Sequence, residues 1–264
     1  MLELKNISKT FNPGTVNEKL ALNNVSLTIE DGDFVTVIGG NGAGKSTMLN
    51  AIAGVWPVDE GQILIDGQDV TKLPEHKRAS YLGRVFQDPM NGTAAAMNIE
   101  ENLALALRRG QKRMLRQGIK ASEREAYREL LSGLGLGLED RMTSKVGLLS
   151  GGQRQALTLL MATLRKPKLL LLDEHTAALD PKTAAKVLET TETIVNRDHL
   201  TTLMITHNMR DAIAHGNRLI MMMKGEIILD IRGEEKQGLS VQDLLSRFEQ
   251  VSGKEFANDK AILG

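Results

Sequence analysis

A glycine-rich loop from Gly39 to Thr47 carries residue types that bind a triphosphate. Its sequence, GGNGAGKST, fits the pattern G-x-x-x-x-G-K-[ST] and lies between a β-branched run and a helical pattern, the context that such a loop requires. Glycines let the backbone form a concave nest of N–H groups, and the following helix adds the positive end of its dipole. Lys45 can reach the β- and γ-phosphates, and Ser46 can ligate Mg²⁺. The predicted triphosphate-binding residues are Gly39, Gly40, Asn41, Gly42, Ala43, Gly44, Lys45, Ser46 and Thr47.

Two neighbouring acids, Asp173 and Glu174, end the apolar run KLLLLD that begins at Lys168. An Asp at the carboxyl end of a buried strand beside a phosphate loop can hold Mg²⁺, usually through water. The next acid, Glu174, can orient and deprotonate an attacking water. The alternative is that Asp173 only caps the next element. Two acids after so apolar a run favour the metal and base roles.

A second anion site is predicted at residues 149–153, LSGGQ, which open a helical pattern. Ser150, Gly151, Gly152 and Gln153 combine a hydroxyl, backbone N–H groups and a helix dipole. One triphosphate does not need two such nests from one chain. Two chains that face each other would give each triphosphate one nest of each kind.

The elements that must position these residues alternate between strand and helix. Residues 2–8 and 22–29 alternate with period two, as half-buried antiparallel strands do. The runs at 34–38, 168–173 and 201–207 are continuous and apolar, which is typical of strands covered on both faces. We expect helices at 45–54, ending at a glycine cap, and at 181–195, where Asp180 caps and Pro181 opens the helix. This alternation predicts an α/β fold with a mostly parallel sheet.

The stretch from Gln87 to Lys166 differs from the rest of the chain in composition, since Ala, Leu, Met, Arg and Glu dominate it. Helical periodicity at residues 99–109 and 122–134 predicts an α-helical insertion into the sheet. Residues 219–230 predict a hairpin that turns at Lys224-Gly225, and one short helix is expected at about 240–251. The predicted division is therefore a core of residues 1–86 and 167–264 and a helical subdomain of residues 87–166.

Composition narrows the function classes. Lys plus Arg equals Asp plus Glu, at 33 each, so no overall field points to nucleic acid. With no cysteine, disulfides and thiolate metal sites are excluded. The longest apolar runs are far shorter than the ~20 residues that span a bilayer, and we expect no direct membrane span.

Taken together, these motifs resemble those of the ATP-binding cassette (ABC) ATPases. Residues 39–47 match the Walker A loop of that family, 168–174 the Walker B strand and 149–153 its signature. Gln87 in VFQDP matches the Q-loop, Leu179-Asp180 the D-loop and His207 in ITHN the switch histidine. All six occur in the family's order, and the resemblance covers residues 1 to about 230. It implies a P-loop NTPase (RecA-like) core, with an N-terminal antiparallel β part and the inserted helices as a signature subdomain.

The resemblance also implies roles for individual residues. Gln87 would sense Mg²⁺ and the attacking water, and His207 would touch the γ-phosphate and hold the Glu174–water geometry. Asp180 would tie two active sites together across a dimer. Ser150 and Gly152 would bind the γ-phosphate of ATP held by the opposite chain. ATP and Mg²⁺ are the implied cofactors, with Ser46, Gln87 and Asp173 at the metal.

Three other features are open to more than one interpretation. In this family adenine usually stacks on an aromatic residue near the first strand, and Phe11 has that place; the alternative is a core Phe. Six basic residues fall within thirteen residues that contain no acid: Arg108, Arg109, Lys112, Arg113, Arg116 and Lys120. They fit a solvated helix face or a contact with anionic lipid or acidic partner loops. The small, uncharged residues of segment 91–102 fit either a groove that accepts a partner's helix or a plain connecting loop.

The function that the resemblance implies is that of the ATPase subunit of a membrane transporter. We expect a homodimer or paired cassettes, transmembrane permease subunits, an extracytoplasmic solute-binding protein and a cytoplasmic location at the inner face of the membrane. An importer of amino acids or another small solute is favoured, because no membrane domain is fused to the cassette. Residues 169–184 and the basic insertion resemble cassettes that accompany aromatic-amino-acid binding proteins. The alternatives are an exporter or lipoprotein-release cassette and a non-transport ABC ATPase.

Overall fold

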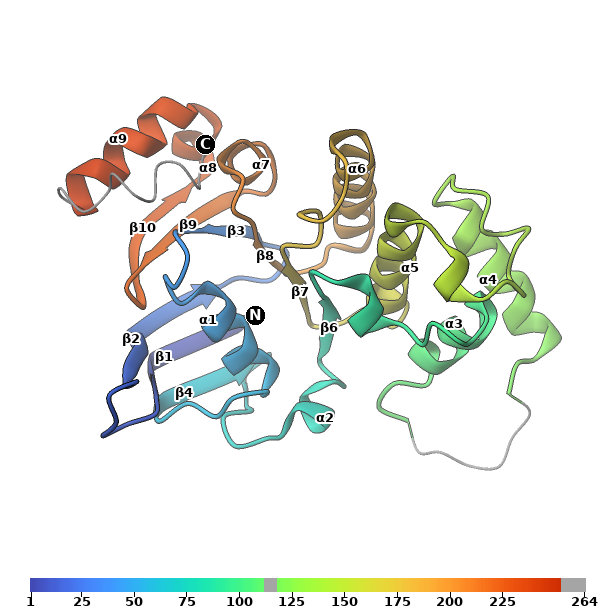
Figure 1. Ribbon diagram of the computed structural model, residues 1–264, viewed down its shortest axis with the longest axis horizontal. Coiled ribbons are helices and arrows are strands. Elements are labelled where there is room, and N and C mark those ends of the chain that lie inside the picture. The colour runs from blue at the N-terminus through green and yellow to red at the C-terminus, as the bar shows by residue number, and fades with distance from the viewer. Residues whose placement is uncertain (112–117, 253–264) are drawn as a thin grey trace.

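The computed structural model describes residues 1–111 and 118–252, which form two sheets with helices packed between and around them (Figure 1). The strands are β1 (Leu2–Phe11), β2 (Lys19–Ile29), β3 (Phe34–Ile38), β4 (Glu60–Ile65), β5 (Gln68–Asp69), β6 (Leu82–Val85), β7 (Leu169–Asp173), β8 (Thr202–Ile205), β9 (Arg218–Met223) and β10 (Glu226–Arg232). The α-helices are α1 (Lys45–Ala53), α2 (Glu75–Arg78), α3 (Ile99–Leu107), α4 (Ala121–Ser132), α5 (Gly151–Thr163), α6 (Pro181–Asp198), α7 (Met209–Ala214), α8 (Gly233–Gln237) and α9 (Val241–Ser252). Two 3-10 turns are η1 (Pro89–Gly92) and η2 (Val146–Leu148).

The larger sheet has the order β10-β9-β3-β8-β7-β6. Its strands from β9 to β6 pair in parallel, and β10 pairs antiparallel with β9. The expected continuous apolar strands are confirmed, because every residue of β3 and β8 is buried. The predicted turn is confirmed too: Lys224 and Gly225 have φ of 49° and 83°, the left-handed values that a tight hairpin requires.

The smaller sheet has the order β2-β1-β4-β5 and is antiparallel. Alternate residues at the end of β2, Val25, Leu27 and Ile29, face the interior, as the period-two pattern predicted. The N-terminal antiparallel part is therefore confirmed.

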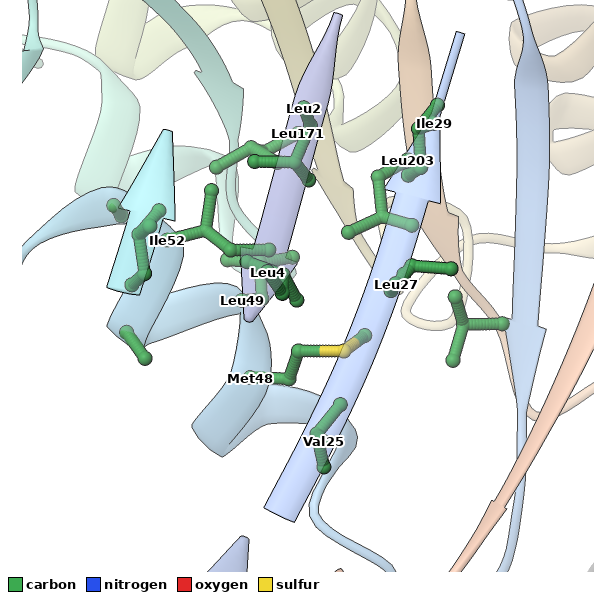
Figure 2. Close-up of a cluster of buried hydrophobic side chains, with 14 of the residues drawn as sticks. Leu2, Leu4, Val25, Leu27, Ile29, Met48, Leu49, Ile52, Leu171 and Leu203 are labelled. Atoms are coloured by element: carbon green, nitrogen blue, oxygen red, sulfur yellow. The ribbon is translucent and has the colours of Figure 1, made fainter. Parts of the chain in front are cut away.

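Helix α1 lies between the two sheets and fixes the glycine-rich loop that precedes it. Met48, Leu49 and Ile52 are fully buried in one cluster with Leu4 and Leu27 of the small sheet and Leu171 and Leu203 of the large one (Figure 2). The helix ends as predicted at Gly54, which caps it with φ 82°. The loop is thus anchored from both sheets.

The helices of the insertion have a core of their own. Ile99 and Leu103 of α3, Leu131 of α4 and Leu157 of α5 are fully buried in one cluster, at the far side of the molecule from β10 (Figure 1). Helix α5 also contributes Leu159 to a second cluster, with residues of β6, β7 and β8. It therefore connects the insertion to the large sheet.

Several short elements were not predicted, and some predicted bounds were wrong. The first inserted helix ends at Leu107 instead of residue 109, because Gly110 adopts φ 71° and turns the chain. Strand β6 and helices α2, α7 and α8 are too short to show a period, so their conformation depends on what they pack against. The tail after Gly233 holds two helices, α8 and α9, where one was expected. No helix within residues 1–111 and 118–252 combines the length and the apolar character that crossing a bilayer needs.

Candidate functional site

The glycine-rich loop has a backbone that only glycine can supply. Gly39, Gly42 and Gly44 have φ of 152°, 79° and 105°. A Cβ on Gly39 would lie 2.2 Å from the Met222 carbonyl oxygen, and one on Gly44 would lie 2.7 Å from that of Ala21. Left-handed φ values and backbone neighbours thus exclude side chains at both ends of the loop. The loop is held in a concave shape by β2 and β9.

This loop encloses a cavity of about 150 Å³. Lys45 is 7% exposed, and its Nζ donates to the carbonyl oxygens of Gly39 at 2.7 Å and Gly40 at 3.1 Å. The lining residues are Lys19, Ala21, Asn41, Gly42, Ala43, Gly44, Lys45, Ser46, Thr47 and Glu174. No sequence motif marks Lys19, because its place depends on the pairing of β1 with β2. The cavity has the shape, cations and N–H groups of a phosphate site.

Glu174 and His207 meet at the carboxyl edge of the large sheet. Asp173 pairs with Ile205 across β7 and β8, and the Glu174 N–H donates to the Ile205 carbonyl oxygen at 3.0 Å. Glu174 adopts φ 44°, a rare conformation for a residue with a side chain. Its Oε2 lies 3.6 Å from His207 Nδ1. The structure therefore brings the predicted base and switch histidine together at the phosphate cavity.

Gln87 lies at the same edge, because Val85 of β6 pairs with Leu172 of β7. Gln87 and Glu174 each lie two residues beyond this pair, toward the carboxyl ends of their strands. Gln87 is exposed there, at the point where the chain leaves the sheet for the inserted helices. Gln87 thus lies at the junction between the large sheet and the inserted helices.

Asp173 is partly buried, with 17% of its side chain exposed. Burial raises the pKa of its carboxyl group, the cation of Arg84 lowers it, and the charge of Glu174 raises it. Arg84 Nη2 lies 3.6 Å from Asp173 Oδ2. The Ser46 hydroxyl and the Asp173 carboxylate are oxygen donors of the kind that Mg²⁺ prefers, so the residues present fit the metal.

The signature residues form the N-terminus of α5. Ser150 caps this helix: its Oγ accepts from the Gln153 N–H at 3.2 Å, and Gln153 Oε1 accepts from the Ser150 N–H. Gly152 is packed so tightly on α6 that a Cβ would lie 2.1 Å from Thr183 Cγ2. Asp180 caps α6 by accepting from the Thr183 N–H at 3.1 Å. None of residues 150–153 is among those lining the cavity, so the two predicted anion sites are separate in one chain.

Comparison with known proteins settles the family. The family model described as ABC transporter matches residues 22–177, a span that holds the glycine-rich loop, Gln87, the signature and the paired acids.

The chain belongs to the ABC transporter family.

The cassette is similar to the tyrosine transport ATP-binding protein of Clostridioides difficile, with 47% identity over 254 residues, 94% of this chain and 99% of the relative. It is also 34% identical over 230 residues to a spermidine/putrescine import ATP-binding protein of Haemophilus influenzae, covering 87% of this chain and 57% of that protein. It is therefore an ATP-binding ATPase subunit of an ABC transporter.

Solved structures of ABC cassettes have the same fold as this chain. A dimeric ATP-binding cassette in a post-hydrolysis state, bound to ADP and Pi, superposes with a TM-score of 0.75 at 31% identity, over 88% of this chain and 98% of that one. The ADP conformation of another ABC transporter cassette gives a TM-score of 0.76 at 27% identity, over 99% and 98%. The P-loop NTPase fold of the cassette is thus established.

Phe11, the predicted adenine platform, ends β1 opposite Lys19 of β2. Its ring packs edge-on against Trp56, with ring centroids 5.0 Å apart and planes at 83°. Lys9 Nζ lies 5.7 Å from the same ring. Because Lys19 lines the phosphate cavity, Phe11 is placed beside the nucleotide site, and adenine stacking stays a prediction. The sequence gives no signal for Trp56, because its loop carries no motif.

A groove of about 1290 Å³ lies between the large sheet and the inserted helices of the cassette. Asn91, Gly92 and Met97 of the predicted docking segment line it, together with Arg84 and Phe86 of the β6 region. Part of the segment thus borders a concavity, and its docking role stays a prediction.

Of the described residues of the basic run, Arg108 and Arg109 are only partly solvated, whereas Lys120 is exposed. Arg108 pairs with Glu123 at 3.1 Å, and Arg109 lines the groove and donates to the Ala162 carbonyl oxygen. Lys120 precedes α4, and its N–H donates to Glu123. Lys112, Arg113 and Arg116 lie outside the described residues.

Proposed function

We propose that this cassette hydrolyses ATP to drive import of an amino acid or another small solute. The observation that carries the proposal is the similarity, almost end to end, to a tyrosine transport ATP-binding protein. A polyamine import ATP-binding protein is a further relative. In this proposal the cassette acts at the inner face of the membrane, with transmembrane permease subunits and an extracytoplasmic solute-binding protein that selects the solute.

The proposed active unit is a head-to-tail dimer. The cavity at Lys45 is lined by its own loop, by Lys19 and Ala21 of β2 and by Glu174, whereas Ser150 and Gly152 are not among its lining residues. A second cassette that presents these two residues would complete the hydrogen bonds to the γ-phosphate. The dimeric state of a related cassette with ADP and Pi supports this arrangement.

In the proposed chemistry, Glu174 accepts a proton from the attacking water while His207, 3.6 Å away, orients that carboxylate and contacts the γ-phosphate. Lys45 neutralises the oxygens of the β- and γ-phosphates. Ser46 and Asp173 would hold Mg²⁺, with Gln87 at its edge, and the ion would neutralise charge that develops on the phosphates. The chain itself positions the nucleophile.

We also propose that residues 87–166 move as a unit against the core formed by residues 1–86 and 167–264. The separate core of the inserted helices supports this division. The groove beside residues 91–102 is the proposed seat of a permease helix. Because Gln87 lies at the junction, nucleotide binding and the seated helix would act on the same segment.

The test is transport by the intact complex. The cassette is purified with its membrane subunits, reconstituted in vesicles and supplied with ATP on the cassette side. Uptake of labelled tyrosine, other amino acids and spermidine is then measured, with a Glu174→Gln complex as the matched inactive control. ATP-dependent accumulation of one solute class is expected. Outward movement, or a cassette that purifies with no membrane subunit, would contradict the import proposal.

A further inference from the structure

Lys19 brings a second cation to the phosphate cavity of the cassette. It opens β2, where it is exposed, and it lines the cavity together with Lys45. The two lysines come from different elements, since Lys45 opens α1 directly after the glycine-rich loop. None of the six motifs includes Lys19, so the pattern of the family implies no role for it.

The ammonium group of Lys19 lies above the middle of the glycine-rich loop. A Cβ on Gly42 would lie 3.2 Å from Lys19 Nζ. Lys45 Nζ lies instead at the start of the loop, where it donates to the carbonyl oxygens of Gly39 and Gly40. No carboxylate within residues 1–111 and 118–252 forms an ion pair with Lys19. This exposed ammonium is therefore available to an anion that enters the loop.

The register of the small sheet places the other end of this residue beside the predicted site of the base. Lys19 pairs with Phe11 across β1 and β2, and residues paired in this way lie about 5 Å apart. A nucleotide whose base stacks on Phe11 and whose terminal phosphates lie at Lys45 must pass its α-phosphate between these two points. Lys19 starts beside Phe11 and ends above Gly42, so its side chain covers that interval.

We propose that Lys19 binds the α-phosphate of the nucleotide and is a further substrate-binding residue of the cassette. This inference rests on the proposed nucleotide site, with the base at Phe11 and the β- and γ-phosphates at Lys45. Because ATP and ADP share the α-phosphate, the contact is the same before and after the γ-phosphate is cleaved. Such a contact stabilises the bound substrate and the transition state equally, so it lowers KM and leaves kcat unchanged.

The experiment measures the affinities of ATP, ADP and AMP for the purified cassette by displacement of a fluorescent ATP analogue. An ammonium about 4 Å from a phosphate charge contributes about fivefold to affinity, even when screened as in bulk water. Lys19→Met should therefore weaken the binding of all three nucleotides about fivefold. Lys19→Arg keeps the charge and should stay within about twofold of the wild type. The loss in Lys19→Met should shrink as the salt concentration rises.

Comparison of the three nucleotides decides which phosphate Lys19 contacts. A loss with ATP and ADP but not with AMP would assign Lys19 to the β-phosphate, and a loss with ATP alone would assign it to the γ-phosphate. Either result overturns the proposal, as does an unchanged affinity for all three. Lys5→Met is the matched control, because Lys5 is an exposed lysine of the same sheet that pairs with Glu3 and does not line the cavity. Its affinities should equal those of the wild type, and a fivefold loss there would overturn a specific contact at Lys19.

Lys45→Met separates this proposal from the proposed nucleotide site. It should weaken ATP and ADP far more than AMP, because Lys45 reaches only the β- and γ-phosphates. If it leaves the affinity for ATP unchanged, the proposed site is wrong. If it has the expected effect while Lys19→Met has none, the role of Lys19 alone is overturned. ATPase rates give a second readout: Lys19→Met should raise KM about fivefold at an unchanged kcat, whereas a lower kcat at an unchanged KM would contradict the proposal.

Discussion

His175, directly after the proposed base, lies in the interface between β7 and α6 and is 2% exposed. Its Nε2 is 3.1 Å from Thr191 Oγ1, and the Thr191 hydroxyl donates to the Val187 carbonyl oxygen at 2.8 Å. Since that hydroxyl has a single proton, Nε2 of His175 must be the donor in this contact. Burial lowers the pKa of His175 from 6.5 to about 4, with a smaller contribution from the charge of His215.

This shift makes the stability of the cassette depend on pH. In the unfolded chain His175 gains a proton below its ordinary pKa of 6.5, whereas in the folded protein it does so only near 4. Acid therefore favours the unfolded state. The contribution of His175 to the free energy of unfolding is complete above pH 6.5 and is lost as the pH falls from 6.5 to 4. A shift of about 2.5 units corresponds to about 3.4 kcal/mol in all. About 2 kcal/mol of this is lost between pH 7.5 and 5.

The assay is urea unfolding of the nucleotide-free cassette in EDTA at pH 7.5 and 5.0, followed by circular dichroism. His175→Gln keeps an N–H donor but does not titrate. The wild type should lose about 2 kcal/mol more than this variant between the two pH values, and other titrating groups cancel in the comparison. Thr191→Val is the matched control: it should lower stability but retain the wild-type pH dependence. An equal pH dependence in the wild type and His175→Gln would refute a neutral, buried ring.

Three further predictions concern the catalytic and signature residues. Glu174→Gln should abolish turnover but retain ATP in a stable dimer on size-exclusion chromatography, and undiminished hydrolysis would contradict the assigned base. A Lys45→Ala chain mixed with a Ser150→Arg chain should regain activity through one intact composite site per mixed dimer, although neither homodimer has one. ATPase activity from a demonstrably monomeric wild type would refute that shared site. Gly152→Ala places a methyl group 2.1 Å from Thr183 Cγ2 and should destabilise the cassette by about 1–3 kcal/mol in urea unfolding. Adding Thr183→Ala to the same chain should restore most of that stability. If the effects of the two substitutions on the free energy of unfolding are simply additive, this clash is excluded.

Some of the site was predictable because its determinants are local. The loop from Gly39 to Thr47 needs left-handed backbone at fixed positions, and glycine marks those positions in the sequence itself. Helix α1 begins and ends at glycines, and α6 begins at Asp180 and Pro181, as predicted. The paired acids were predictable for a similar reason, because an apolar run long enough for one strand leads directly to them.

Other parts depend on contacts between distant segments. Lys19 enters the phosphate cavity through the pairing of β1 with β2. Arg84 reaches Asp173 only because β6 lies beside β7, although 89 residues separate the two side chains along the chain. Strand β6 itself has four residues, too few for a period, so its pairing decides its conformation.

The sequence by itself determined the family, the main alternation of strands and helices and the glycine-rich loop, since each of these follows from residue types within a few positions of one another. Only the tertiary structure decided which side chains from distant segments lie in contact. It neutralised His175 by burying it against α6, gave Gly152 a packing contact with Thr183, and placed Arg84 between the groove and Asp173. Burial and pairing across strands set these interactions, and neither is encoded in local spacing.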